Sequence, residues 1–314
     1  MRVVTFGYQT WGHKTLEALL ASSHEVVLAV THPPSDHAYE AIWDDSVEEL
    51  ARANGIPVHL AKRPDAELIE RVKLAEPDVI VANNWRTWLP RELFDLPPHG
   101  TLNLHDSLLP KFTGFSPVIW ALISGESEVG LTAHRMDDGL DTGDIVVQRS
   151  LPIGPKDTAT QLVRATIDII PDVLLDALEQ IENGTAQWRP QNLADRTFFH
   201  KRSDRDSNID WTWPAEDLDR LVRALSDPYP NAYTHYRGQR IRIVQASVSV
   251  CRYGGTPGRI FIKEGDGMVI VAGPDAHLGR NRGLVVERVR TEDGVEHGAD
   301  EFFPQGGGYL TPHP

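Results

Sequence analysis

Three polar residues with types suited to acyl transfer lie within one stretch of the chain. Asn103 and His105 are two positions apart at the end of an apolar run, residues 101–105, and Asp141 follows in the glycine-containing stretch DGLDTG, residues 138–143. In a β-strand, residues i and i+2 share a face, so the side chains of Asn103 and His105 project to the same side. A tight turn over 138–143 can present Asp141 toward that strand.

This combination suits transfer of a formyl group to an amine. Attack of an amine on a formyl carbonyl creates an oxyanion, which needs preorganised hydrogen-bond donors. The amide of Asn103 and a protonated His105 can both donate. An imidazole with an unperturbed pKa of about 6.5 exchanges protons near neutrality, and a carboxylate beside it orients the ring and favours the charged form. We therefore predict that Asn103, His105 and Asp141 are catalytic.

Two motifs around these residues resemble a known enzyme family. The string NLHDSLLP, residues 103–110, continues as KFTGFSP, residues 111–117, and resembles the signature of the 10-formyltetrahydrofolate-dependent formyltransferases. The turn at 138–143 resembles the second motif of that family, at a matching interval. The resemblance extends over nearly the whole chain. It implies N-formyl transfer with 10-formyltetrahydrofolate as the donor and with Asn103, His105 and Asp141 as the catalytic trio.

The same resemblance implies which residues contact the two substrates. The folate is expected against two loops, one formed by Asn84, Trp85, Arg86, Thr87, Trp88 and Leu89 and the other by Met136, Asp137, Asp138, Gly139 and Leu140. The amine acceptor is expected near Tyr8, Asp106, Ser107, Lys111, Phe112, Gly114 and Phe115. Alternatively, the tryptophans pack between domains and do not contact the folate, and Asp106 is a solvated turn residue that does not bind the acceptor.

Charge and loop composition favour a small acceptor. The net charge of −14 repels a polyanion such as tRNA, and Lys111 is the only basic residue in the loop that follows Pro110. The stretches VTFGYQTWG, residues 4–12, and NNWRTW, residues 83–88, resemble the formyltransferases of actinobacterial hydroxamate-siderophore clusters. This resemblance implies δ-N-hydroxyornithine as the acceptor, with no nucleic-acid partner. The oligomeric state stays open.

Several other functions stay open at this point. Within the family, the acceptor can instead be methionyl-tRNA or a sugar nucleotide, or the trio can release formate from 10-formyltetrahydrofolate to water. A non-catalytic folate-binding protein is a further alternative. A zinc site at His105, His134 and Asp141 is conceivable, but His134 and Asp141 lack helical i, i+4 spacing, and we expect no metal. Residues 7–15 approach a phosphate-binding P-loop, but the extra His13 displaces the lysine.

The elements that must position the trio alternate between strand and helix. Apolar runs predict strands at 3–7, 25–31, 56–60, 78–82 and 101–105, and helices are predicted at 12–20, 46–54, 65–75 and near Pro90. This pattern is typical of an α/β, Rossmann-like doubly wound sheet, with strand ends where ligands bind. Further strands are predicted at 129–136 and 145–153, and a helix at 157–183, kinked at Pro171 and ended by Gly184.

The rest of the chain predicts a second, smaller domain. A helix at 215–225 and Gly-punctuated strands at 240–250, 258–262 and 267–271 favour a small OB-like β-barrel. We therefore predict a catalytic domain over 1–190, a linker over 191–207 and a barrel over 208–314. Cys251 is the only cysteine, no apolar run approaches the ~20 residues of a membrane span, and the N-terminus enters a strand at once. A cytoplasmic, non-membrane protein is the expectation.

Overall fold

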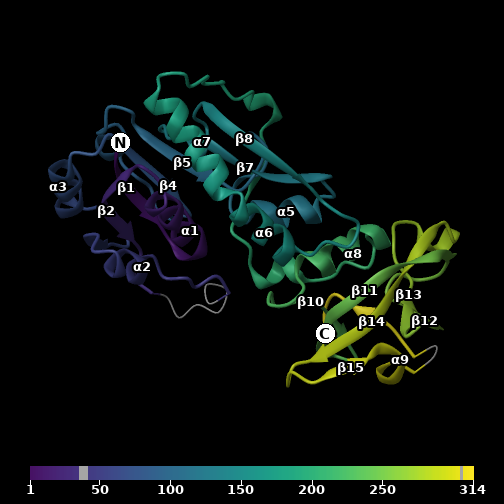
Figure 1. The fold of residues 1–314 in the computed structure, drawn as a ribbon. Helices are drawn as coiled ribbons and strands as arrows, with labels where there is room; N and C mark the ends of the chain where they lie inside the picture. The colour runs from purple at the N-terminus through teal and green to yellow at the C-terminus, as the bar shows by residue number, and fades with distance from the viewer. Residues whose placement is uncertain (35–41, 305–306) are drawn as a thin grey trace. The chain divides into compact units, whose positions relative to one another are not determined.

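The computed structural model describes residues 1–34, 42–304 and 307–314, and Figure 1 shows its elements. The chain divides into two compact units. The first unit comprises residues 1–118, 128–152 and 163–200, and the second comprises residues 119–127, 153–162 and 201–314. The candidate catalytic residues all belong to the first unit.

A seven-stranded sheet forms the first unit, in the order β3-β2-β1-β4-β5-β7-β8. Its strands are β1 (Arg2–Gly7), β2 (Glu25–Thr31), β3 (Val58–Leu60), β4 (Val79–Asn83), β5 (Thr101–His105), β7 (Glu128–Arg135) and β8 (Ile145–Pro152). The strands from β1 to β5 are parallel, and β7 and β8 join antiparallel. The predicted α/β doubly wound sheet is confirmed.

Helices cover both faces of this sheet. One face carries a core of side chains from β1, β2 and β4 against α3 (Ala66–Ala75) and α4 (Arg91–Phe94). The other face packs against α1 (Gln9–Leu20) and α2 (Val47–Ala53), and α7 (Ile170–Glu182) lies beside α1 and contacts β7 and β8. Ser46 caps α2 as predicted, since its hydroxyl accepts a hydrogen bond from the Glu49 N–H at 3.1 Å.

The junction between β1 and α1 leaves no space for a phosphate-binding loop. Helix α1 begins at Gln9, only two residues after β1 ends at Gly7, whereas the sequence predicted a start at Gly12. A Cβ added to Gly7 would lie 2.7 Å from the Cα of Gly12. This close approach explains both glycines, and the backbone does not loop out as a P-loop requires.

The prediction of one long helix at 157–183 is wrong in one respect. It is two helices, α6 (Ala159–Asp168) and α7, separated at Ile169. Pro171 occupies the first turn of α7, where its missing N–H has no intrahelical partner to lose. The proline therefore starts a new helix instead of kinking one. Gly184 follows α7 with a positive φ of 67°, as expected at a helix end.

The second unit is an antiparallel barrel with α8 (Ala215–Ala224) packed on it. Its strands are β10 (Ala232–Tyr236), β11 (Gln239–Tyr253), β12 (Ile260–Glu264), β13 (Gly267–Ile270), β14 (Asn281–Thr291), β15 (Glu296–Gly298) and β16 (Leu310–Thr311), with α9 (Ala299–Phe302) before β16. The order is β12-β13-β14-β11-β10-β16, with β15 beside β14. A bridge between Arg259 and Tyr309 joins the two end strands, so the predicted barrel closes.

Short elements complete the described chain. They are β6 (Thr113–Gly114), α5 (Pro117–Ile123), β9 (Phe198–Phe199) and three single 3₁₀ turns. Strands β6 and β9 form a two-stranded parallel sheet, so the stretch expected as a linker contains a paired strand. Across residues 1–34, 42–304 and 307–314, no helix combines the length and apolarity that crossing a membrane requires.

Candidate active site

The structure brings the predicted trio together at the end of β5. Strands β5 and β7 pair so that Asn103 lies opposite His134 and His105 opposite Thr132. Asp141 comes from the turn after β7. Its Oδ2 lies 3.9 Å from Nδ1 of His105, and its Oδ1 lies 3.9 Å from Nε2 of His134. Asp141 therefore lies beside both histidines, and His134 in turn contacts Asn103, so the predicted trio and His134 form one cluster of side chains.

His134 fixes the orientation of the Asn103 amide. Nδ1 of His134 lies 2.9 Å from the backbone carbonyl of Arg135, so it must carry the proton. Nε2 is then an acceptor, and it lies 3.0 Å from Nδ2 of Asn103. The asparagine thus donates one amide hydrogen to His134 and keeps its second N–H for another partner. The sequence had suggested His134 only as a metal ligand, because strand register is not readable from spacing.

The surroundings of His105 favour its charged form. Nε2 lies 3.1 Å from the backbone carbonyl of Phe112, and the ring is buried. Burial disfavours the imidazolium, but the carboxylates of Asp141 and Asp106 and the Phe112 carbonyl outweigh burial. The pKa of His105 is therefore raised above the usual value.

The opposite holds for His134. Burial lowers its pKa, the Asp141 carboxylate opposes this only partly, and the nearby charge of His105 lowers the pKa further. A neutral His134 agrees with the tautomer that its hydrogen bonds require.

Asp141 is held by its backbone more than by its side chain. Its φ is +53°, a left-handed conformation that costs a non-glycine residue free energy. One carboxylate oxygen accepts a hydrogen bond from the Gly114 N–H at 3.2 Å. Both distances from the carboxylate to the histidines are too long for a hydrogen bond, so the attraction acts through space.

The two predicted folate loops meet on one side of the sheet. Trp85 and Met136 both pack against the core cluster built from β1, β2 and β4. Arg91, at the start of α4, forms an ion pair with Asp138 in the second loop. Asp137 is used inside that loop, where it accepts from the Gly139 N–H at 3.0 Å and from the Thr142 hydroxyl at 2.5 Å.

Several side chains in these loops fit a flat heterocycle with polar edges. The Trp85 indole N–H and the Thr87 hydroxyl are buried and have no hydrogen-bond partner among the described residues. Trp88 and Leu140 are about half exposed, at 57% and 42%, and supply apolar surface. A pterin offers donors and acceptors on its edge and an apolar face. Leu89, by contrast, is a core residue, 3% exposed. The Nδ2 of Asn84 donates a hydrogen bond at 3.1 Å to the carbonyl of Tyr8, between β1 and α1.

Arg86 is anchored to the first loop of the chain. Its guanidinium donates to Oε1 of Gln9 at 2.6 Å and lies over the Tyr8 ring, 4.8 Å from the centroid. Tyr8 also contacts the His32 ring edge-on, and His32 stacks on Trp85 at 3.9 Å. The predicted acceptor residue Tyr8 and the predicted folate residue Arg86 are therefore parts of one cluster. Gln9 was not predicted, and a glutamine in a helix start gives no signal by itself.

Asp106 is the acceptor residue with the most unusual surroundings. Burial raises the pKa of its carboxyl group, against the opposing effects of His105 and the Trp11 indole. Among the described residues, no Lys or Arg forms an ion pair with it. The Ser107 hydroxyl donates to the Lys111 carbonyl at 2.9 Å.

The remaining predicted acceptor residues line the loop after Pro110. Lys111 and Phe115 are exposed, Phe115 at 45%. Phe112 stacks on Phe199 with ring centroids 5.0 Å apart, and Gly114 has a φ of +102° that favours glycine. In the part of the chain that the structure describes, no group of three or more His, Cys, Asp or Glu side chains is arranged to hold a metal ion.

Two known family models match most of the chain. Residues 1–178 match the formyl transferase family, and residues 201–305 match the formyl transferase C-terminal domain. The chain belongs to the formyl transferase family. It is a formyltransferase, and the formyl donor of this family is 10-formyltetrahydrofolate, so the predicted activity and donor are confirmed.

Relatives with curated names share about a third of the sequence. The methionyl-tRNA formyltransferase of Desulfotalea psychrophila is 33% identical over 88% of this chain and 86% of its own length. That of Anaeromyxobacter dehalogenans is 32% identical over 93% of each chain.

Solved structures support the fold. WlaRD, a sugar 3N-formyl transferase crystallised with dTDP and 5-N-formyl-THF, superposes with a TM-score of 0.67 at 18% identity, covering 94% of this chain and 99% of its own. A methionyl-tRNA formyltransferase from Clostridium thermocellum has a TM-score of 0.55 at 20% identity, covering 79% and 94%.

Proposed function

We propose that this formyltransferase transfers the formyl group to a small zwitterionic amine, δ-N-hydroxyornithine, as in hydroxamate siderophore assembly. The observation that carries the proposal is Asp106. It follows the catalytic strand directly, it is partly buried beside His105, and it pairs with no Lys or Arg among the described residues. The imidazolium of His105 offsets only part of the cost of burying this carboxylate, since the pKa of Asp106 stays raised, so a second cation beside it is favourable. The α-ammonium group of an amino-acid acceptor supplies that cation.

The nucleophile of this acceptor suits the site. A hydroxylamino nitrogen is less basic than an alkyl amine, so it is largely neutral and nucleophilic near pH 7. The free N–H of Asn103 then donates to the formyl oxygen as negative charge builds on it. Nδ1 is the nitrogen of His105 that exchanges the proton with the substrates, because Nε2 donates to the Phe112 carbonyl. The 3.9 Å gap between Nδ1 and Asp141 leaves that nitrogen available to a reacting atom.

The test is a comparison of acceptors. Purified protein with 10-formyltetrahydrofolate is offered δ-N-hydroxyornithine, ornithine, charged initiator tRNA and a dTDP-aminosugar, and release of tetrahydrofolate is followed. We expect turnover with hydroxyornithine, and less with ornithine because its δ-amine is protonated at pH 7. Efficient turnover of the tRNA with none of hydroxyornithine would overturn the proposal.

Formylation of methionyl-tRNA is the second candidate, favoured by the names of the curated relatives and by the charge distribution. Residues 201–314 contain 15 Lys and Arg against 16 Asp and Glu, so the acidic excess lies almost wholly in residues 1–200. The total charge of −14 is therefore a weaker argument against a polyanion than the sequence suggested.

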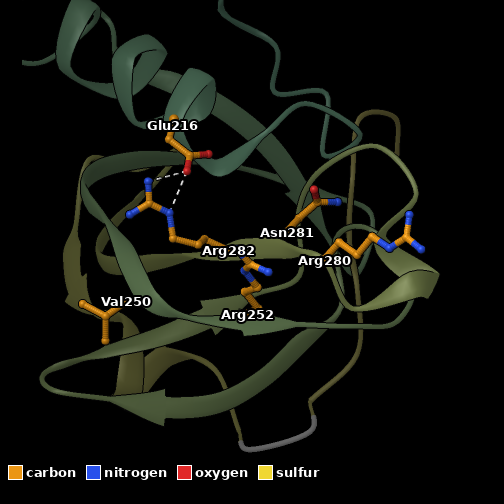
Figure 2. A pocket seen from close by; sticks show the side chains of 6 residues that line it. All are labelled: Glu216, Val250, Arg252, Arg280, Asn281 and Arg282. Carbon is orange, nitrogen blue, oxygen red and sulfur yellow. Dashed lines mark hydrogen bonds and ion pairs between the residues drawn. The ribbon is translucent and has the colours of Figure 1, made fainter.

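A basic pocket in the second unit adds to this candidate. It has a volume of about 490 Å³, and Figure 2 shows Arg252, Arg280 and Arg282 around it, with an ion pair from Arg282 to Glu216. Arg252 and Arg282 lie directly opposite each other on β11 and β14. Glu216 pairs with Arg282, and among the described residues no carboxylate pairs with Arg252 or Arg280. If tRNA is the acceptor, Arg252→Ala with Arg280→Ala weakens tRNA binding and leaves turnover of a small amine unchanged.

A further inference from the structure

The segment from residue 189 to residue 199 runs along the active site without contributing any predicted site residue. Its start is fixed to β8, because the backbone N–H and carbonyl of Arg189 both bond Ile145 at 2.9 Å. Its end is β9, which pairs with β6. The segment belongs to the first unit and connects the two loops on which the His105–Asp141 pair depends.

Side chains of this segment hold the turn that carries Asp141. The Gln191 amide nitrogen donates to the backbone carbonyls of Asp141 at 2.9 Å and Gly143 at 2.8 Å. The guanidinium of Arg196 donates to the carbonyl of Leu140. Three of four consecutive carbonyls in the turn, at residues 140, 141 and 143, thus accept from this one segment.

The same segment holds the loop that contacts His105. The Phe112 N–H donates to the Thr197 hydroxyl at 2.9 Å, and the Thr113 N–H donates to the Thr197 carbonyl at 2.9 Å. Arg196 also donates to the Thr113 hydroxyl at 3.2 Å. Phe112 supplies the carbonyl beside His105 Nε2, so the partners of both members of the pair are fixed by one stretch of chain.

The geometry of the pair makes this support necessary. Asp141 makes no hydrogen bond to His105, since the two side chains are 3.9 Å apart. The position of its carboxylate is set by one hydrogen bond from the Gly114 N–H and by the backbone, which at Asp141 adopts a left-handed φ of +53°. A conformation of this kind persists only where surrounding contacts over-determine it.

We propose that Gln191 is a positioning residue, which holds the backbone at Asp141 and Gly143 and so keeps the Asp141 carboxylate facing His105. The inference rests on the proposed roles of His105 and Asp141, but not on the identity of the acceptor. The amide oxygen of Gln191 is buried and has no hydrogen-bond partner among the described residues. The side chain therefore acts through its two N–H donors.

A measurable consequence follows for His105. The titratable groups that face its ring are Asp106, directly after β5, Asp141 on the held turn, and His134 on β7, which is neutral. Of these, only Asp141 is fixed by Gln191. Loss of the Gln191 donors lets the Asp141 carboxylate move away, so the imidazolium loses a stabilising charge and its titration moves to lower pH.

The experiment compares Gln191→Met, which keeps the length but removes both donors, with Gln191→Asn, which keeps an amide but shortens its reach. Gln187→Met is the matched control, because the Gln187 amide is exposed and touches only the nearby Thr185 carbonyl at 3.5 Å. The His105 ring signal is titrated by NMR without substrates, Tm is recorded, and kcat and KM are measured with 10-formyltetrahydrofolate and hydroxyornithine.

We expect a lower His105 midpoint in both Gln191 variants, with kcat reduced by up to about 10²-fold, as misplacement of a catalytic group produces, and with the KM for the folate nearly unchanged. The control keeps wild-type values. A wild-type His105 midpoint in either folded Gln191 variant overturns the proposal, whether or not Tm falls. If the wild-type enzyme ignores hydroxyornithine, the acceptor proposal fails, while the NMR titration still decides the role of Gln191.

Discussion

Strands β5 and β7 each place one buried histidine beside the same carboxylate, and the pKa values of the two histidines are shifted in opposite directions. His105 on β5 and His134 on β7 both lie 3.9 Å from an oxygen of Asp141. The pKa of His105 is raised, whereas that of His134 is lowered. Distance to the carboxylate therefore does not decide the protonation state of either ring.

The other groups beside each histidine decide the direction of its pKa shift. His105 has a second carboxylate beside it, Asp106, and the Phe112 carbonyl also favours its charged form. His134 has the charge of His105 beside it instead. Two residues of the same type thus differ in their pKa values: His105 is the candidate for proton transfer, and His134 accepts a hydrogen bond from the Asn103 amide.

Replacing the charged ring has the largest expected effect. His105→Ala lowers kcat by about 10²–10⁴-fold, the usual contribution of a general acid–base group. Folate binding is retained, as equilibrium titration with 5-formyltetrahydrofolate checks. The exposed His99→Ala serves as the control. A variant that keeps wild-type kcat would show that the ring is structural.

Removing the Asp141 carboxylate tests why the pKa values of His105 and His134 differ. Asp141→Asn lowers kcat by a similar factor, and folding is retained. It also lowers the His105 pKa, because the main favourable charge is gone.

The raised pKa of His105 also makes the stability of the protein depend on pH. A raised pKa in the folded state means that His105 contributes stability below pH 6.5 and loses it as the pH rises through the folded-state pKa. In Asp141→Asn this loss moves to lower pH. Urea unfolding between about pH 5 and pH 9 measures it, and identical profiles for the two proteins would contradict this account.

The sequence was sufficient to predict β5 and to place Asn103 and His105 on one face of it, because residues i and i+2 on a strand share a face whatever the partner strand does. The catalytic roles of Asn103, His105 and Asp141 remain a prediction. The sequence was not sufficient for His134, whose role depends on the register that places it opposite Asn103. Register and contacts between distant segments are set by tertiary packing. Gln191 could not be predicted for the same reason. It lies fifty residues from Asp141 in the sequence, inside a stretch that composition predicted to be a linker.

The neutral ring is tested by removing its acceptor nitrogen. His134→Phe keeps a flat buried ring but leaves the Asn103 amide without its partner, so the amide can rotate. We expect kcat to fall by up to about 10²-fold through misorientation, with the His105 titration nearly unchanged, since a neutral His134 places no charge beside that ring. His134→Gln, which can still accept from Asn103, should recover part of the activity. Equal loss in both variants would show that packing, and not orientation, is what His134 provides.

The second carboxylate beside His105 is expected to matter for binding more than for the chemical step. Asp106→Asn raises the KM for the amine acceptor by about 10- to 100-fold, the range for a lost charge-assisted hydrogen bond, with a smaller change in kcat. The pKa of Asp106 is raised by burial, so its ionised form disfavours folding at neutral pH. The variant should therefore have a higher Tm than the wild type at pH 7, and this gain should shrink as the pH falls and the wild-type carboxyl becomes protonated. A lower Tm with an unchanged acceptor KM would mean that Asp106 stabilises the fold and does not bind the acceptor.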